Sequence, residues 1–299
     1  MHYTGTIWRP PYEASSLLLE VTAGCTHHKC KFCTLYDDLP FPFRMSSIEC
    51  IEEDLIEAKE KFSLWKDDKI QRTFLTGGNP FVLNYERLMT IAGLVKKYFP
   101  ENRTIGCFAR ITDILLKTDL ELKGLRQAGY DGLTIGIETG DNEALKFMNK
   151  GYVSSDILKQ CKRLEQAGIS YSFFYLTGIS GKGRGEEGAK ATAEVCNKLH
   201  PKLIGANMLT IYPQSELYQE IKKGNWQEEG EIEKYKELRI LVEKLSISTV
   251  FAALGASNAV QIQGKLPEDR ERLLAVLDEI IESVNEEKLR KYRKNLPHL

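Results

Sequence analysis

Short apolar runs alternate with amphipathic stretches along the first two thirds of the chain. The amphipathic stretches repeat their apolar positions with the period of a helix, whereas the short runs are rich in β-branched and aromatic residues. Ser46 with Glu49, and Thr118 with Glu121, have the spacing of a capping box at a helix start. The pattern predicts strands at 17–24, 72–76, 104–108, 132–137, 171–176 and 203–211, and helices at 46–62, 85–98, 118–128 and 185–199, with further helical stretches up to 167.

Six strand–helix units in series predict a parallel sheet, because a strand, a crossover helix and the next strand pack with the two strands parallel. We therefore expect an α/β fold, a partial (β/α)6 TIM-like barrel over residues 16–215, preceded by an N-terminal extension of residues 1–15. Beyond Pro213 the alternation stops. Helical patterns at 216–222, 231–245 and 268–284, with an apolar segment at 249–254, predict a short helical C-terminal cap over residues 216–285, and residues 286–299 are expected to be a polar, solvated tail.

The composition narrows the class of protein. The 299 residues are 42% hydrophobic and have a formal net charge of -1, which allows one sizeable core. This charge and a pI of about 6.6 argue against a broad basic surface, so nucleic acid is not an expected partner. The first residues lack the features of a signal peptide, and no apolar run approaches the roughly 18 residues that span a membrane. We expect a cytoplasmic protein that is not bound to a membrane.

Three of the seven cysteines lie within nine residues, directly after the first apolar run. Cys25, Cys30 and Cys33 stand on a short loop leaving a strand, so their sulfurs have the freedom to converge on one metal centre. Three thiolates without a fourth nearby cysteine suit a [4Fe–4S] cluster with one open iron. A structural zinc site with His27 or His28 as fourth ligand is the alternative, although zinc ligands usually come as two separated pairs. The other cysteines are scattered and are predicted to be buried or redox thiols: Cys50, Cys107, Cys161 and Cys196.

The unusual motifs of the chain follow predicted strands. The cysteine loop follows the first strand, Gly77-Gly78-Asn79 the second, and Glu138-Thr-Gly140 the fourth. Active sites of α/β barrels lie at the carboxyl ends of the strands, so these segments are predicted to share one site. Taken singly, each has an ordinary structural interpretation, such as a turn at the glycines or a helix cap at Glu138. Their order after successive strands favours the functional interpretation.

With the cysteine loop after the first strand and the aromatic Phe32 directly before the last cysteine, the sequence resembles the radical SAM superfamily. The usual spacing in that family is C-x3-C-x2-C, whereas this chain has C-x4-C-x2-C, which widens the first turn. The resemblance extends over residues 15 to 215. Within the superfamily, the sequence resembles an uncharacterised branch that has the wider loop, and this branch is distantly similar to coproporphyrinogen dehydrogenase-like members.

The resemblance implies a [4Fe–4S] cluster and S-adenosylmethionine (SAM) as cofactors, with the three clustered cysteines as the cluster ligands. The Gly-Gly-Asn turn matches the Gly-Gly-Glu of the family, which meets the methionine ammonium, and Asn79 in place of Glu leaves backbone carbonyls to accept those hydrogen bonds. Glu138 matches the residue that binds the ribose hydroxyls, and Lys150 suits the methionine carboxylate. The residues implied in cofactor binding are Phe32, Gly77, Gly78, Asn79, Glu138, Lys150, Thr177 and Tyr212, the last two at strand ends where the backbone holds adenine.

The implied activity is that of a radical SAM enzyme. The reduced cluster cleaves SAM to a 5′-deoxyadenosyl radical, which abstracts hydrogen from a substrate that the sequence does not identify, so the enzyme is an oxidoreductase, lyase or transferase. A flavodoxin or ferredoxin-type protein is the expected electron donor, and a small molecule is the expected substrate. The alternatives are a non-catalytic iron–sulfur or zinc protein, serving as a binding module or electron carrier, and a TIM-type hydrolase with an incidental cysteine loop. Candidate substrate contacts are Arg110, Tyr175 and Asn258, with Tyr36 and Arg44 after the cysteine loop.

Overall fold

The computed structural model describes residues 1–64 and 70–295, and the chain forms two compact units. The chain passes between the units several times, so each unit is built from separate segments. The cysteine loop is divided as well, with Cys25 in the first unit and Cys30 and Cys33 in the second. Unit 1 comprises Met1–His28, Leu35–Ile135 and Lys162–Tyr171, and unit 2 comprises Lys29–Thr34, Gly136–Cys161 and Ser172–Leu299.

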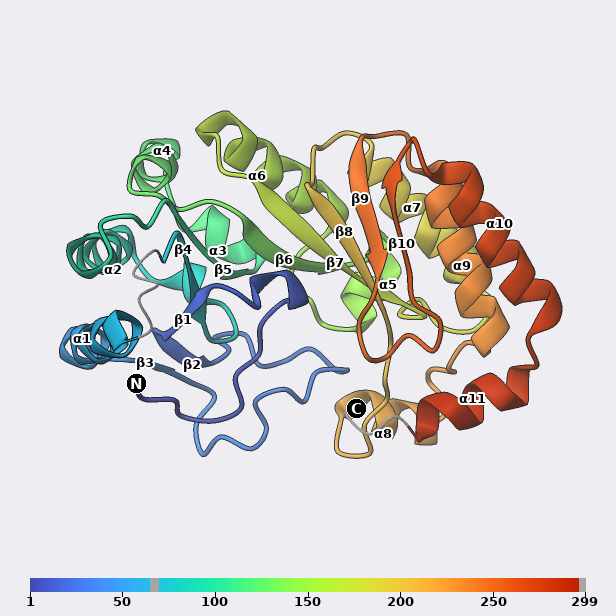
Figure 1. Ribbon diagram of the computed structural model, residues 1–299. Coiled ribbons are helices and arrows are strands. Elements are labelled where there is room, and N and C mark those ends of the chain that lie inside the picture. Colours follow the sequence, from blue (N-terminus) through green and yellow to red (C-terminus); the bar gives the residue numbers. More distant parts are fainter. Residues whose placement is uncertain (65–69, 296–299) are drawn as a thin grey trace. The chain divides into compact units, whose positions relative to one another are not determined.

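The fold is α/β with a mostly parallel sheet, as predicted. In the described part of the chain this sheet has eight strands, in the order β1-β4-β5-β6-β7-β8-β9-β10 (Figure 1). The pairs β1–β4, β4–β5, β5–β6, β7–β8 and β8–β9 are parallel, and β9–β10 is antiparallel. The strands are β1 (Leu17–Glu20), β4 (Arg72–Thr76), β5 (Thr104–Ala109), β6 (Leu133–Glu138), β7 (Tyr171–Thr177), β8 (Leu203–Met208), β9 (Thr249–Ala253) and β10 (Ile262–Leu266).

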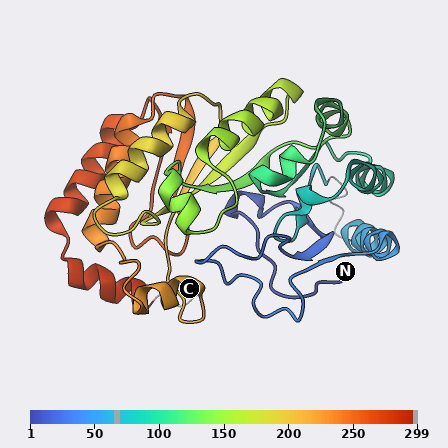
Figure 2. The same ribbon diagram turned by 180° about the vertical axis from the view of Figure 1, so that it is seen from behind.

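In unit 1, three helices lie in a row beside β1, β4 and β5 (Figures 1 and 2). They are α1 (Ile48–Leu64), α2 (Tyr85–Tyr98) and α4 (Asp119–Gln127), and α2 contacts both of the others. The predicted capping box of α4 is confirmed, because the Thr118 hydroxyl accepts the Glu121 N–H at 3.2 Å while the Glu121 carboxylate accepts the Thr118 N–H at 2.6 Å. Leu19 of β1 and Leu75 of β4 are paired in register on one face of the sheet, and both are fully buried in the core of this unit.

In unit 2, α9 (Glu231–Lys244) packs between α7 (Gly185–Cys196) and α10 (Arg270–Ser283), as Figure 1 shows. Along β7 the buried side chains alternate with partly exposed ones, so one face of this strand is covered and the other is not. The stretch after β6 forms two helices, α5 (Asn142–Phe147) and α6 (Ser154–Ala167). Helices were predicted there without separate bounds.

The first predicted strand is two strands in the structure. β1 ends at Glu20, and β2 (Thr22–Gly24) leaves the main sheet to pair antiparallel with β3 (Phe43–Met45), which the sequence pattern did not indicate. The sixth predicted strand is also shorter than expected, since β8 ends at Met208.

The C-terminal region contains strands as well as the predicted helices. The apolar segment at 249–254 is β9, which extends the parallel sheet, and β10 follows as its antiparallel neighbour. The residues expected to form a polar tail instead continue into a helix, α11 (Glu286–Lys294), with Leu289 and Arg293 buried. Residues 296–299 of that expected tail lie outside the described residues. Among the helices of the described part, none is long and apolar enough to cross a membrane.

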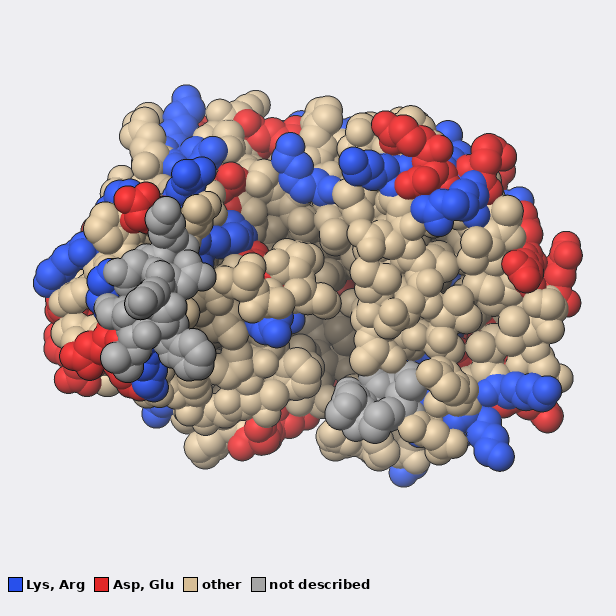
Figure 3. Space-filling view, viewed as in Figure 1, with Lys and Arg blue, Asp and Glu red and all other residues tan. Residues whose placement is uncertain are grey.

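Charged side chains of both signs are mixed on the surface of unit 2. Over α9, α10 and α11, Figure 3 shows acidic and basic groups next to each other. Arg239 pairs with Asp278 at 2.5 Å, and Arg290 with Glu286 at 3.2 Å. This mixture of signs agrees with the formal net charge of -1.

Candidate functional site

Cys25 begins the cysteine loop at the end of β2 in unit 1. Its side chain is half-buried, and its main-chain N–H donates to the Pro42 carbonyl at 2.9 Å. Pro42 directly precedes β3, the partner strand of β2. The β2–β3 ribbon therefore fixes the backbone of the first cysteine. None of the seven cysteines, all of which lie within the described ranges, forms a disulfide, and Cys33 is exposed.

The Gly77-Gly78 turn after β4 lies directly against the start of the cysteine loop. Gly77 has a φ of +128°, and a Cβ atom there would come within 1.9 Å of the Thr22 hydroxyl oxygen. A Cβ atom on Gly78 would lie 2.8 Å from the Cβ of Cys25, and the Gly78 N–H donates to the Gly24 carbonyl at 2.9 Å. A larger side chain at either position would force the loop away, so this contact requires both glycines.

Asn79 follows the two glycines and is completely buried. Its side-chain oxygen accepts the Thr26 N–H at 3.1 Å, and its nitrogen donates to the Thr26 hydroxyl at 2.7 Å. The same nitrogen donates to the Asp113 carboxylate at 3.1 Å. The Asn79 side chain thus connects the cysteine loop to α3 (Ile111–Leu115).

Asp113 is a buried acid that the sequence interpretation missed. Burial raises its pKa to about 6, although hydrogen bonds from the Arg110 N–H and the Asn79 amide oppose this rise. The spacing Arg110-x-x-Asp113 at the start of a helix is the signal that identifies Asp113, because a side chain at that position accepts the N–H at the helix start. Arg110 itself, a predicted substrate contact, is half-buried and donates to the Thr112 hydroxyl at 3.2 Å.

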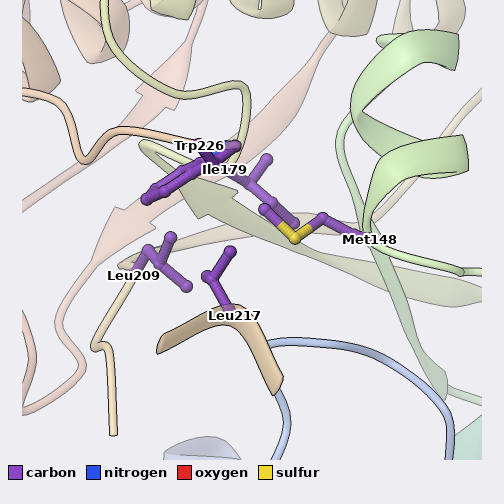
Figure 4. Close-up of a cluster of buried hydrophobic side chains, with 5 residues drawn as sticks. All are labelled: Met148, Ile179, Leu209, Leu217 and Trp226. Atoms are coloured by element: carbon purple, nitrogen blue, oxygen red, sulfur yellow. The ribbon is translucent and has the colours of Figure 1, made fainter. Parts of the chain in front are cut away.

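Residues 29–34 of the cysteine loop are fixed within unit 2 by two main-chain hydrogen bonds of Lys31. Its N–H donates to the Met148 carbonyl at 3.2 Å, and its carbonyl accepts the Leu217 N–H, from α8 (Glu216–Lys222), at 2.7 Å. The neighbouring Phe32 packs against a buried hydrophobic cluster, whose side chains converge in Figure 4. This cluster consists of Met148, Ile179, Leu209, Leu217 and Trp226.

Glu138 and Lys150 form an ion pair in unit 2, in which Lys150 is buried and Glu138 is half-buried. The Lys150 Nζ lies 2.9 Å from Glu138 Oε1 and also donates to the Gly136 carbonyl at 3.1 Å. Glu138 ends β6 with a φ of +63°, an unfavourable backbone conformation for a residue other than glycine. The ammonium is also 5.8 Å from the centre of the Phe32 ring. Three of the predicted cofactor-binding residues are therefore neighbours.

Thr177 and Tyr212, predicted to border the adenine, differ in their surroundings. Thr177 ends β7, is fully buried, and has a hydroxyl group without a hydrogen-bond partner among residues 1–64 and 70–295. Its carbonyl accepts the Leu209 N–H at 2.9 Å and keeps a second lone pair. The Tyr212 carbonyl accepts both the N–H and the hydroxyl of Ser215, at 3.0 and 2.7 Å, and partial burial raises the pKa of the Tyr212 phenol.

Two predicted substrate contacts are buried, with their donor groups already bound by protein. The Tyr175 hydroxyl donates to Glu237 of α9, because the alternation of side chains along β7 places Tyr175 on the covered face. The Asn258 amide nitrogen donates to the Ala206 carbonyl at 3.0 Å. On the other face of β7, Phe174 is partly exposed.

Within the described ranges, no group of three or more His, Cys, Asp or Glu side chains has the geometry to hold a metal ion. The donor set of the cysteine loop nevertheless has the chemistry of an iron–sulfur site, with three cysteines outside any disulfide at short spacing. His28, a possible fourth ligand in the zinc alternative, has its Nε2 3.6 Å from Asp37 Oδ1 and a φ of +45°.

Comparisons with known proteins bear on the family of this chain. The sequence profile of the Radical SAM superfamily matches residues 19–194, which is more than half of the chain. The heme chaperone HemW of Buchnera aphidicola subsp. Schizaphis graminum is 23% identical over 207 residues, covering 68% of this chain and 53% of HemW. The chain spans about half the length of the curated relatives it matches.

Two solved structures share the fold. Coproporphyrinogen III oxidase (HemN) from Escherichia coli superposes with a TM-score of 0.55 at 16% identity, over 77% of this chain and 52% of HemN. Methylornithine synthase (PylB) superposes with a TM-score of 0.54 at 14% identity, over 93% of this chain and 85% of PylB. The residues that the superfamily profile matches include the cysteine loop, the Gly77-Gly78 turn and the Glu138–Lys150 pair. The chain therefore belongs to the radical SAM superfamily.

Proposed function

We propose that this protein is a radical SAM enzyme in which Cys25, Cys30 and Cys33 bind a [4Fe–4S] cluster. Membership of the superfamily implies this cluster and SAM as cofactors. The observation that carries the proposal is the anchoring of the cysteine loop. Cys25 is fixed by β3 and the Gly77-Gly78 turn in unit 1, and the Lys31 segment is fixed by main-chain hydrogen bonds in unit 2.

The three thiols fit the cluster because thiolate is its usual ligand and three ligands leave one iron open. When bound, the cluster supplies the electron that cleaves SAM, and the resulting 5′-deoxyadenosyl radical takes a hydrogen atom from the substrate. The protein binds and orients the reactants, and it excludes water from them.

Glu138 and Lys150 are the proposed polar contacts of SAM in unit 2. The Glu138 carboxylate accepts hydrogen bonds from ribose hydroxyls, and the Lys150 ammonium has donors for a carboxylate. Their ion pair matters before SAM binds, because Lys150 neutralises a carboxylate that is only 14% exposed. Phe32 supplies an apolar wall next to the ammonium. The backbone of the Gly77-Gly78 turn, Thr177 and Tyr212 are the remaining proposed contacts.

Radical SAM enzymes need a reductant, and we infer a flavodoxin or ferredoxin-type donor in the reducing cytoplasm. A small molecule is the proposed substrate. Arg110 stays among the proposed substrate contacts, whereas Tyr175 and Asn258 are left out, because their side chains are buried and bound by protein.

The test is cleavage of SAM by protein reconstituted with iron and sulfide in the absence of oxygen and reduced with dithionite. We expect 5′-deoxyadenosine, detected by mass spectrometry, from the wild type. The control variant Cys50→Ala removes a half-buried cysteine of α1, outside the cysteine loop, and is expected to form the product as well. Cys33→Ala is expected to lose the product. A wild type that binds a full cluster but forms no 5′-deoxyadenosine, with or without cell-derived small molecules, would contradict the proposal and favour an electron carrier.

A further inference from the structure

The side chain of Asn79 is fully occupied in holding the residue that follows Cys25. Its nitrogen donates to the Thr26 hydroxyl at 2.7 Å and to the two oxygens of Asp113 at 3.1 and 3.2 Å, and its oxygen accepts the Thr26 N–H at 3.1 Å. Asn79 and Asp113 are 0% and 1% exposed, and all of these residues belong to unit 1. An amide with both hydrogens engaged has none left for a ligand.

We propose that Asn79 and Asp113 are positioning residues that clamp Thr26 and thereby fix the direction of the Cys25 thiol. The inference rests on the proposed function in taking Cys25 as a cluster ligand. Asn79 binds both the main chain and the side chain of Thr26, so Thr26 rotates only if both bonds break. Because a planar peptide joins the two residues, an immobile Thr26 restricts the backbone of Cys25.

The Asp113 carboxylate determines which way the Asn79 amide faces. An ionised carboxylate only accepts hydrogen bonds, so the amide nitrogen must be turned toward it. The amide oxygen then faces the Thr26 N–H, and a flipped amide would lose both contacts. Asp113 is itself fixed, because it accepts the Arg110 N–H at 2.8 Å.

The same geometry makes Asp unsuitable at position 79. The carboxylate of an Asp there would face Asp113 across a hydrogen-bond distance, and two buried carboxylates repel unless they share a proton. Asn79 and Asp113 therefore depend on each other. The clamp also acts where the loop is longer than usual, since Thr26 is the first of the four residues between Cys25 and Cys30.

The experiment uses the full chain without cofactor, so that its result does not depend on cluster binding. Hydrogen exchange of the Thr26 amide and the rate of Cys25 alkylation by iodoacetamide are measured, with Cys33 as an internal reference. We expect Asn79→Asp to speed exchange at Thr26 by about tenfold or more. The double variant Asn79→Asp/Asp113→Asn again pairs one carboxylate with one amide, so exchange is expected to return to within about threefold of the wild type.

Thr26→Val keeps the shape of an exposed side chain while removing its hydroxyl, so this variant tests the clamp if Asn79→Asp fails to fold. It is expected to raise both rates by a smaller factor, and Thr90→Val, at an exposed threonine of α2, is expected to change neither. Unchanged rates of exchange and alkylation in Asn79→Asp and Thr26→Val, or a double variant whose rates are no closer to the wild type than those of Asn79→Asp, would overturn the clamp.

In a second experiment the protein is reconstituted with iron and sulfide. The electron paramagnetic resonance spectrum is expected to differ between Thr26→Val and the wild type. If the reconstituted wild type bound no cluster, the proposed function would be contradicted, whereas the hydrogen-exchange result for the clamp would remain valid.

Discussion

Replacing Lys150 by Met removes the charge that balances Glu138. The side chains of the pair are 5% and 14% exposed, with Nζ and Oε1 2.9 Å apart. Met retains the apolar stem, so the main effect is an unpaired carboxylate in a site nearly closed to water. Removing one partner of a buried ion pair costs about 3–5 kcal/mol. We expect the lower end, about 3 kcal/mol, because Glu138 keeps some contact with water.

The assay is urea unfolding of the cofactor-free protein at pH 7, followed by tryptophan fluorescence. The free energy of unfolding is expected to fall by that amount with the slope unchanged. The double variant Lys150→Met/Glu138→Gln also removes the unpaired Glu138 carboxylate. It is expected to recover at least half of the free energy of unfolding that Lys150→Met loses. Lys146→Met, at an exposed lysine of α5, is expected to stay within about 0.5 kcal/mol of the wild type. A loss below about 1 kcal/mol for Lys150→Met, or no recovery in the double variant, would refute this reasoning.

Three further outcomes follow from buried groups. Burial and the neighbouring Glu229 raise the pKa of Glu237 well above 4.5, so the folded state binds the proton more tightly and stability falls as pH rises above 4.5. Glu237→Gln should flatten that fall in urea midpoints measured from pH 5 to 8, and an equally steep fall would count against it. Arg293→Met should lower stability by about 1–2 kcal/mol, because it removes one of the two cations that pair with Glu231, which is 2% exposed and keeps Lys234 at 3.3 Å; an unchanged melting temperature would show that α11 contributes little. Cys107, whose pKa burial raises, should resist iodoacetamide in the folded chain while the cysteine loop is labelled, and equal labelling would contradict its burial.

Sequence periodicity predicts most of unit 1 and much of unit 2, because helices and parallel strands there follow their own apolar patterns. The predicted helix at 85–98 has the observed bounds of α2, and Thr118 caps α4 as expected. The bounds of 72–76 likewise coincide with β4. Local patterns suffice where burial comes from neighbours along the chain.

Hydrophobic periodicity did not predict elements whose burial depends on contacts with residues distant in the sequence. β10 alternates buried and exposed residues but contains Gly264, and it becomes a strand by pairing with β9. In α11, Arg293 is buried because its guanidinium reaches the acid Glu231, 2.8 Å away, a pairing that polarity along the sequence does not reveal. The burial of Tyr175, a predicted substrate contact, has a related cause. The pattern shows which residues alternate along β7, but α9 decides which face is covered.

The cysteine loop shows the same division between what spacing reveals and what tertiary contacts add. Spacing identifies the three thiols, but the residues that fix the loop come from elsewhere in the chain. In unit 1 the Thr26 side is tied to Asn79, and in unit 2 the Lys31 side is tied to Met148 and Leu217. A loop with an additional residue between its first two cysteines has more conformations to lose on metal binding than a shorter one. Restraints formed before the metal binds reduce that loss, so the longer loop makes clamps outside the motif more important to cluster binding.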